Sequence, residues 1–186
     1  MIIMEIIKPN LIRAVQAIKS GKVLVCPTDT VYGLVCDAGN KKAVKKLYKI
    51  KKRPSGKPVP IFIKNIMMAK KLAKINPVQE KYLKKVWPGK VTAVLERKDG
   101  RGTIGLRIPN HPWLLDLVKQ QPSRPLTGTS ANISGKPAST NIKEVIGQFE
   151  GQKYQPDLVI DAGNLPKAKP SKVIDLTIWP PKILRY

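Results

Sequence analysis

Apolar residues recur every three to four positions in several segments of the chain, which is the period of an amphipathic helix. In the first of these segments, Leu11, Val15 and Ile18 fall on one face. Gly21 follows at the position where a helix C-cap is expected. Asn40 can cap the second helix. The predicted helices cover residues 9–20, 40–52, 111–120 and 141–149, with two short helices inside 65–86.

Short apolar runs bounded by Pro, Gly or Asp lie between these segments, and such runs are typical of β-strands. The N-terminal MIIMEIIKPN is interpreted as a strand, because it has neither the basic start nor the cleavage site of a signal peptide. The run PVPIFI opens with proline, which favours an edge strand. The predicted strands lie within residues 1–10, 22–27, 58–63, 91–97, 103–109, 125–130, 157–163, 172–177 and 182–186.

Helices alternate with strands along most of the chain, which predicts a layered α/β domain. The last three strands have no helix between them, so the sheet is expected to be mixed and not purely parallel. A length of 186 residues suits one domain with a real core, and no repeat or linker divides it. Residues 1–186 are therefore expected to form a single domain, with no apolar run long enough to span a bilayer.

The charge is strongly positive and unevenly distributed. The chain has 35 Lys and Arg against 12 Asp and Glu, a formal net charge of +23. No acidic residue occurs between Asp37 and Glu80. Such a field attracts nucleic acid, nucleotide phosphates or anionic membranes. Lysine runs also form ordinary solvated helix faces, so both interpretations of this segment stay open.

The sequence lacks the signatures of several common catalysts. His111 is the only histidine and lies in a PNHPW turn, where it can cap a helix, so Ser-His-Asp and Cys-His mechanisms are not expected. No zinc spacing, Walker A sequence or GxGxxG is present, and aromatic residues, at 5%, provide no base-stacking set. Cys26 and Cys36 have no partner pair, which fits a reduced, cytoplasmic protein.

Two hydroxyl-rich stretches follow predicted strands. PTDTVYGL, residues 27–34, comes after an apolar run, and LTGTSANISGKP, residues 126–137, comes after another. Ligands of open α/β sheets bind beyond the carboxyl ends of strands, so these two stretches indicate a polar pocket. The bland alternative is turn chemistry, because Ser, Thr, Asn and Gly form turns in every fold.

Cations near these stretches suggest what such a pocket binds. KIKKRP ends the second predicted helix, where its cations either complement the helix dipole or hold phosphate. Arg107 lies inside an otherwise apolar strand, where an unpaired charge is costly. It therefore needs a carboxylate or phosphate partner, and a substrate carboxylate would serve. Arg185, in KILRY, also lies in an apolar strand pattern, but the argument for a partner is weaker because chain ends are often exposed.

Seven motifs occur in a fixed order along nearly the whole chain. They are PTDTVYGL (27–34), KKRPSGKP (51–58), WPGKVT (87–92), TIGLRIPNHP (103–112), TSANISG (129–135), PSKVIDL (170–176) and ILR (183–185). Together they make the chain resemble the YrdC/Sua5/TsaC family of threonylcarbamoyl-AMP synthases. The length is similar to that of the short, single-domain form, without the C-terminal domain of the longer Sua5 form.

The resemblance implies a fold and an activity. The fold is a mixed, twisted sheet flanked by helices around a deep basic concave cleft, of the YrdC/RibB type. The activity is condensation of L-threonine, bicarbonate and ATP into threonylcarbamoyl-AMP and pyrophosphate. A separate transferase complex then uses this product to modify adenosine 37 of tRNA. Mg²⁺ is expected with ATP, with no protein side chain as metal ligand and no covalent nucleophile.

The resemblance also implies site residues by motif match. Those expected to hold threonine are Thr30, Arg107, Gly128 and Ser171. Those expected to hold ATP are Lys51, Arg53, Lys57, Thr103, Ser130, Asn132 and Arg185.

The sequence departs from the family pattern at three positions. Phe62 stands where long forms often have His, Ala138 stands where a Ser follows the SAN loop, and Ser171 lies in PSKV where long forms read ESTV. Two rival functions are also considered. One is a non-catalytic protein that binds double-stranded RNA or tRNA through the basic surface. The other is the related module of hydrogenase-maturation carbamoyltransferases, whose zinc-finger-like and acylphosphatase portions this chain lacks.

Overall fold

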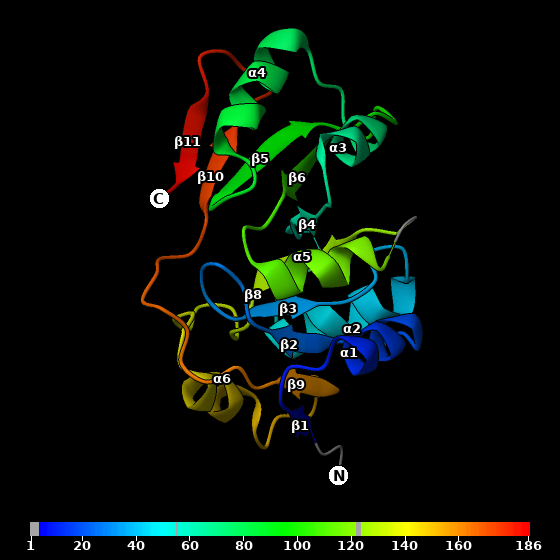
Figure 1. Ribbon diagram of the computed structural model, residues 1–186, viewed down its shortest axis with the longest axis vertical. Helices are drawn as coiled ribbons and strands as arrows, with labels where there is room; N and C mark the ends of the chain where they lie inside the picture. The colour runs from blue at the N-terminus through cyan, green and yellow to red at the C-terminus, as the bar shows by residue number, and fades with distance from the viewer. Residues whose placement is uncertain (1–3, 55, 122–123) are drawn as a thin grey trace.

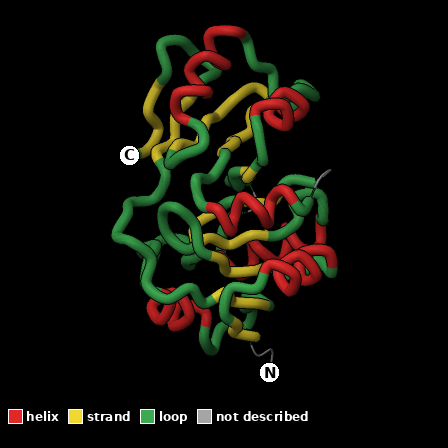
Figure 2. Tube along the Cα trace, viewed as in Figure 1, coloured by secondary structure: helices red, strands yellow, loops and turns green. Residues whose placement is uncertain are grey.

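The computed structural model describes residues 4–54, 56–121 and 124–186, so the first three residues of the predicted N-terminal strand lie outside it. Six helices and two mixed β-sheets form this part of the chain (Figures 1 and 2). The predicted α/β class is confirmed. The strands are divided between two sheets, whereas the sequence pattern predicted one.

The first sheet has five strands, and helices cover both of its faces. β1 and β2 run parallel to β9, whereas β3 is antiparallel to β2 and β8. Helices α1 (Leu11–Lys19) and α5 (Pro112–Lys119) pack on one face, and α2 (Lys41–Lys51) and α6 (Ile142–Phe149) pack on the other. Burial on both sides explains why these strands are continuously apolar. The strand order is β1 (Glu5–Ile7), β9 (Leu158–Ile160), β2 (Leu24–Cys26), β3 (Gly33–Val35) and β8 (Thr129–Ser130).

The second sheet has six strands, and helices cover one of its faces. Helices α3 (Ile66–Leu72) and α4 (Pro77–Val86) pack against Ala93, Leu95 and Leu106. Alternate residues of the same strands point away from this core, because side chains in a strand alternate between faces. This second face is turned toward the first sheet (Figure 1). The strand order is β11 (Lys182–Arg185), β10 (Lys172–Asp175), β5 (Val91–Glu96), β6 (Thr103–Arg107), β4 (Ile61–Phe62) and β7 (Leu126–Thr127).

Capping residues explain where the helices begin. Five of the six helices start after an asparagine whose side-chain oxygen accepts a backbone N–H of the first turn. The sixth, α5, starts after His111, whose Nδ1 accepts the Leu114 N–H at 3.4 Å. The capping interpretation of His111 is therefore confirmed. At the end of α1, Gly21 adopts a φ of 75°, which is the left-handed conformation expected after a helix.

Three strand predictions were wrong in detail. The turn PTDTVYGL was not expected to end in a strand, but Gly33–Val35 forms β3. PVPIFI was expected at an edge, but β4 pairs with both β6 and β7. PLTGTS was expected as one strand, but the chain passes at Gly128 from β7 in one sheet to β8 in the other. None of the helices in the described ranges has the length and apolar character that a membrane crossing requires.

Candidate active site

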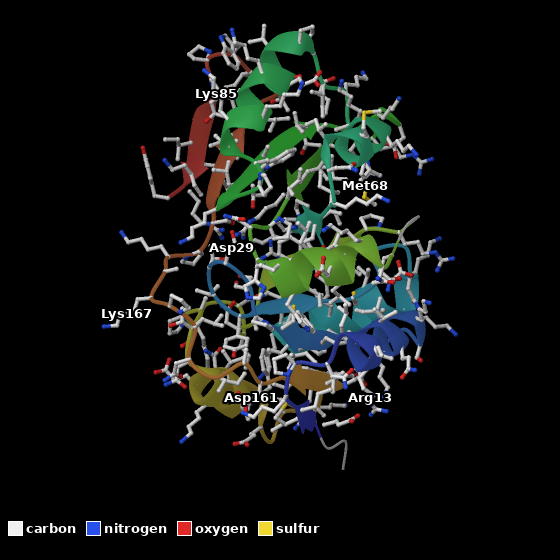
Figure 3. All side chains as sticks on the ribbon, in the orientation of Figure 1. Arg13, Asp29, Met68, Lys85, Asp161 and Lys167 are labelled. Carbon is white, nitrogen blue, oxygen red and sulfur yellow. The ribbon has the colours of Figure 1, made fainter. Side chains whose placement is uncertain are left out.

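A cavity of about 250 Å³ lies between the uncovered face of the six-stranded sheet and the loops that leave the five-stranded sheet. This is near the lower end of the roughly 300–1,000 Å³ typical of small-molecule sites. Thr92, Val94 and Arg107 line it from the larger sheet. Thr28 and the segments 30–33 and 128–130 line it from the other side. Figure 3 places Asp29 at the junction between the two parts of the molecule.

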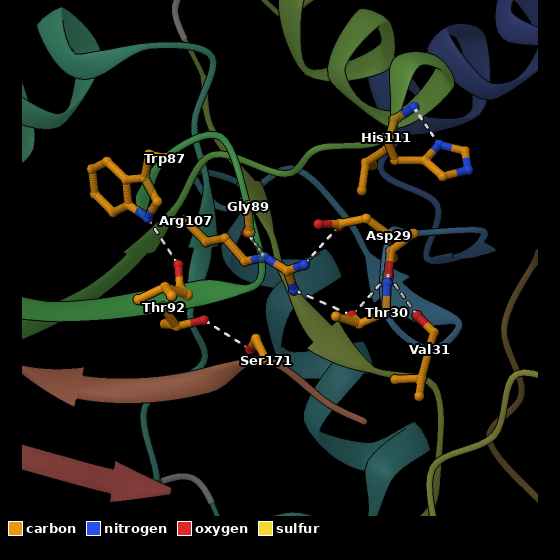
Figure 4. A network of polar contacts seen from close by, with 12 residues as sticks. Asp29, Thr30, Val31, Trp87, Gly89, Thr92, Arg107, His111 and Ser171 are labelled. Carbon is orange, nitrogen blue, oxygen red and sulfur yellow. Dashed lines mark hydrogen bonds and ion pairs between the residues drawn. The ribbon is translucent and has the colours of Figure 1, made fainter. Parts of the chain in front are cut away.

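Arg107 is held on three sides, as Figure 4 shows. Its Nη2 lies 2.6 Å from Asp29 Oδ1, in an ion pair whose side chains are only 6% and 7% exposed. Its Nε donates to the Gly89 carbonyl at 2.9 Å, and its Nη1 donates to Thr30 Oγ1 at 3.3 Å. A guanidinium carries five N–H groups, so two of them have no partner among the described residues. These two N–H groups are available to an anion in the cavity.

The two threonines of the opening turn form a fixed hydroxyl pair. The Thr28 hydroxyl donates to the Val31 carbonyl at 2.7 Å, and its oxygen accepts the Thr30 N–H at 3.0 Å. The two hydroxyl oxygens are 3.0 Å apart. Because the Thr28 proton is already used, Thr30 donates to Thr28 and accepts from Arg107. PTDTVYGL is therefore both a structured turn and part of a cavity wall.

A second hydroxyl pair lies on the larger sheet (Figure 4). Thr92 Oγ1 is 3.0 Å from Ser171 Oγ, and both residues are buried. Arg185 on β11 donates from Nη2 to the Ser171 carbonyl at 2.8 Å. Ser171 thus links β5 to β11 at the cavity wall. Its bond with Arg185 holds that arginine beside the cavity.

Three arginines face this one cavity, namely Arg53, Arg107 and Arg185, and no carboxylate is among the described residues that line it. Burial lowers the pKa of Arg107 despite Asp29, and Arg185 lowers it further. Burial, and then the charge of Arg53, lowers the pKa of Arg185. Mutual repulsion of three cations favours an anion between them. The cavity is therefore electrostatically suited to carboxylate or phosphate.

Most of the site residues implied by the family resemblance come together at this cavity. All four of the predicted threonine-binding residues line it, and so do four of the predicted ATP-binding residues: Arg53, Thr103, Ser130 and Arg185. Lys57 is exposed on the loop after α2, and its carbonyl accepts a hydrogen bond from Arg53 Nε at 3.2 Å. Lys51 and Asn132 are buried beside the 130–132 backbone and do not line the cavity. The ligand-binding roles of these residues stay predictions.

Gly128 and Phe62 form a close contact in the wall. A Cβ atom at Gly128 would lie 2.9 Å from two atoms of the Phe62 ring, so only glycine fits without movement. The Phe62 ring also faces Arg107, whose Cζ is 5.8 Å from its centroid, within reach of a cation–π interaction. Phe62, which departs from the family pattern, therefore places the face of its ring against the Arg107 guanidinium.

Two site residues were not predicted from the sequence. Asp29 lies within the stretch PTDTVYGL, but its pairing with Arg107 was not expected. Thr92 was not singled out, although it lies two residues before Val94 on the cavity side of β5. The alternation of Thr92 and Val94 with buried Ala93 and Leu95 is the signal that could have found it.

The described part of the chain holds no group of three or more His, Cys, Asp or Glu side chains arranged for a metal ion. Both cysteines are buried, and burial raises the pKa of the Cys36 thiol to about 11. Burial also raises the pKa of Cys26. Neither thiol is therefore suited to act as a nucleophile at neutral pH.

The fold and the cavity define an α/β protein with a cavity that three arginines make electrostatically suited to small anions. The chain belongs to the Sua5/YciO/YrdC family, whose model carries the description "Telomere recombination" and matches residues 16–186. The resemblance noted in the motifs is thereby confirmed.

Two curated relatives and one solved structure illustrate the similarity. The threonylcarbamoyl-AMP synthase of Pyrococcus abyssi is 38% identical over 177 residues, which cover 90% of this chain and 51% of that protein. A putative threonylcarbamoyl-AMP synthase of Methanocaldococcus jannaschii is 36% identical, over 87% of this chain and 77% of its own. The crystal structure of P. abyssi Sua5 complexed with L-threonine has a TM-score of 0.86 at 35% identity, covering 98% of this chain and 57% of that one. The chain thus spans about half the length of the P. abyssi relative.

Proposed function

We propose that this protein is a threonylcarbamoyl-AMP synthase. It condenses L-threonine, bicarbonate and ATP into threonylcarbamoyl-AMP and pyrophosphate, with release of water. The observation that carries the proposal is the convergence of three arginines on a cavity with no lining carboxylate in the described chain. The names of the relatives and the threonine complex of a family member support the choice of substrates.

The reaction makes little demand on protein nucleophiles. Bicarbonate takes up a proton and loses water to give CO₂. The free amine of threonine adds to this CO₂ and gives a carbamate, with release of the same number of protons, so that water is the net by-product. A carbamate oxygen then attacks the α-phosphorus of ATP, and pyrophosphate leaves with the electron pair of the broken P–O bond. The protein must hold two anions together and stabilise the charge that builds on phosphorus, which positioning and fixed cations can do.

The cavity suggests how the amino acid is held. The two N–H groups of Arg107 without a partner among the described residues match the two oxygens of the threonine carboxylate. Thr30 and Ser171 offer hydroxyl groups to the same cavity, and Gly128 also lines it. We assign these four residues to L-threonine.

The remaining cations suggest how the nucleotide is held. Arg53 and Arg185 line the cavity and repel each other, which favours phosphate between them. Thr103 and Ser130 line the same space, and Lys57 follows Arg53 on its loop. We assign these five residues to ATP. The wall offers no carboxylate to a metal in the described chain, so Mg²⁺ would arrive held by the phosphates of ATP and would neutralise their charge.

The product is a mixed anhydride that a second enzyme must consume. We propose that a tRNA threonylcarbamoyl transferase complex accepts it for modification of adenosine 37. The surface of α2 can attract tRNA, because Lys41, Lys42 and Lys45 are all exposed. Like charges at this spacing repel each other, and the phosphates of an RNA backbone would relieve that repulsion. A non-catalytic RNA-binding protein would need only this surface and not the buried arginine site.

The test is the fate of labelled bicarbonate. Protein incubated with ATP, Mg²⁺, L-threonine and ¹³C-bicarbonate is expected to yield a nucleotide product whose mass contains AMP, threonine and one labelled carbon. Mass spectrometry at early times detects this product before it hydrolyses. Absence of any labelled nucleotide under conditions where ATP and threonine both bind would overturn the proposal.

A further inference from the structure

Lys51 is the last residue of α2, and its side chain points into the protein. The residue is only 2% exposed. Its Nζ donates to the Ser130 carbonyl at 2.6 Å, to the Asn132 carbonyl at 2.9 Å and to Asn132 Oδ1 at 3.1 Å. An ammonium group has three N–H donors and no acceptor, so these three contacts use all of its capacity.

The segment that Lys51 holds forms part of the cavity wall. Ser130 lines the cavity, and Gly128, two residues earlier, lines it as well. The Ser134 N–H donates to the Lys51 carbonyl at 2.8 Å, so the backbone of the same lysine adds a fourth link. Asn132 Oδ1 also accepts from the Ser130 hydroxyl at 2.6 Å, and its Nδ2 donates to the Lys136 carbonyl at 2.6 Å. The end of α2 is thus tied to the whole 130–134 segment.

The charge on Lys51 is retained at a cost. All three acceptors are neutral dipoles, and a buried cation without a carboxylate partner is unfavourable. Burial, assisted by the charge of Arg53, lowers the pKa of Lys51 to about 7. A contact with phosphate would require the ammonium to give up at least one of its three hydrogen bonds. The geometry therefore fits a lysine that holds the 130–132 backbone in place better than one that binds the phosphates of the nucleotide.

We infer that Lys51 is a positioning residue, which holds the 130–134 segment against the end of α2 and does not itself contact the nucleotide. The statement about the nucleotide rests on the proposed function, whereas the structural role of Lys51 does not. It reassigns a residue that the motif pattern alone would place among the ATP ligands. It also makes the cavity-lining Ser130 depend on a side chain outside the cavity.

The first test uses the ligand-free protein, so it does not depend on the proposed reaction. In Lys51→Met, backbone amides of residues 130–134 are expected to exchange with solvent about 10-fold faster or more, because a charge-assisted hydrogen bond is lost. Strands β2 and β9 should be unchanged. Lys45→Met, an exposed lysine on the same helix, is the matched control and should leave the segment unchanged. Unaltered exchange in 130–134 would overturn the inference.

The second test separates positioning from direct contact. Calorimetric titrations with L-threonine, adenosine and ATP are expected to show weaker binding of all three to Lys51→Met, by roughly 10-fold. A direct phosphate ligand would instead weaken ATP alone, and this result would contradict the inference. If the wild-type protein bound none of the three, the proposed function would fail while the exchange result would still stand.

A second variant guards against a folding defect. Asn132→Ala keeps the lysine but removes one of its three acceptors. It also removes the bond that Asn132 Oδ1 accepts from the Ser130 hydroxyl and the two bonds that Nδ2 donates. Should Lys51→Met not fold, Asn132→Ala is expected to show the same local increase in exchange. No increase in this variant would overturn the inference as well.

Discussion

Arg107 and Asp29 form a buried ion pair, 2.6 Å between Nη2 and Oδ1, that joins strand β6 to the opening turn of the cavity. The sequence indicated that Arg107 needed an anionic partner, and a substrate carboxylate was put forward. The structure supplies that partner from the chain itself. The pair fixes the guanidinium before any ligand arrives, and two of its N–H groups have no partner among the described residues.

Removing the carboxylate should therefore cost both stability and substrate binding. Asp29→Ala leaves Arg107 buried without its counter-charge, and we expect a loss of about 3 kcal/mol in the free energy of unfolding. The KM for threonine should rise about 10-fold or more, because the arginine is no longer oriented. Denaturant unfolding and steady-state kinetics measure the two effects. Asp116→Asn, which breaks an exposed pair with Lys119, should cost less than about 1 kcal/mol. Equal effects of the two variants would refute the role of the buried pair.

Gly128→Ala should destabilise the protein because of one contact. The added Cβ would lie 2.9 Å from the Phe62 ring, and overpacking of this kind costs about 1–3 kcal/mol. Phe62→Leu in the same chain should recover part of the loss. Gly105→Ala is the matched control, since its Cβ would meet Thr92 at an ordinary 3.5 Å. Thermal unfolding of the wild type, the two single variants at 62 and 128, the double variant and the control tests this, and additive effects of residues 62 and 128 would contradict the contact.

Arg53→Ala should remove activity without unfolding the protein. Among the described residues its guanidinium donates only to the Lys57 and Pro58 carbonyls of its own loop, so the free energy of unfolding should change by less than about 1 kcal/mol. Turnover should fall by roughly 100-fold or more, because a fixed cation beside the phosphates is lost. Arg97→Ala, which removes a partly exposed arginine paired with Asp99 away from the cavity, should retain normal turnover. Normal turnover in Arg53→Ala would exclude it from the phosphate site.

Lys51 should make stability depend on pH. Its pKa is about 7 in the folded protein and 10.5 when unperturbed, so between these values the unfolded chain holds one proton more. The stability linked to this group is therefore complete above about pH 10.5 and is lost as the pH falls through about 7. The wild-type protein should gain stability relative to Lys51→Met as the pH rises across this window. Because other groups titrate alike in both proteins, a difference in the free energy of unfolding that stays constant with pH would refute the prediction.

Local signals made much of the fold predictable. Apolar periodicity located the helices, with Asn40 as an expected cap, and short apolar runs located most strands. The exceptions all depend on contacts between distant segments. β3 has only three residues, and Gly128 divides β7 from β8 because Phe62 fills the space that a side chain would need. β4 is internal because β7 returns to it from more than sixty residues later in the sequence.

The part of the site that could be predicted came from the order of the family motifs along the chain. Eight of the eleven residues implied by the family resemblance line one cavity, among them the alternating Thr103 and Arg107 of β6. The sequence could not show that Asp29 pairs with Arg107, or that Lys51 bonds to the 130–132 backbone. Both contacts join residues about 80 positions apart, where only the folded chain brings them together.

Threonine-dependent release of pyrophosphate tests the central claim most directly. The reaction contains ATP, Mg²⁺ and bicarbonate, with L-threonine present or absent and with L-serine and L-alanine as controls. The proposed function predicts release with threonine, much less with serine, and none above background with alanine or without amino acid. Release that is absent, or that is equal under all conditions, would contradict the assignment of the arginine-lined cavity to threonine and ATP.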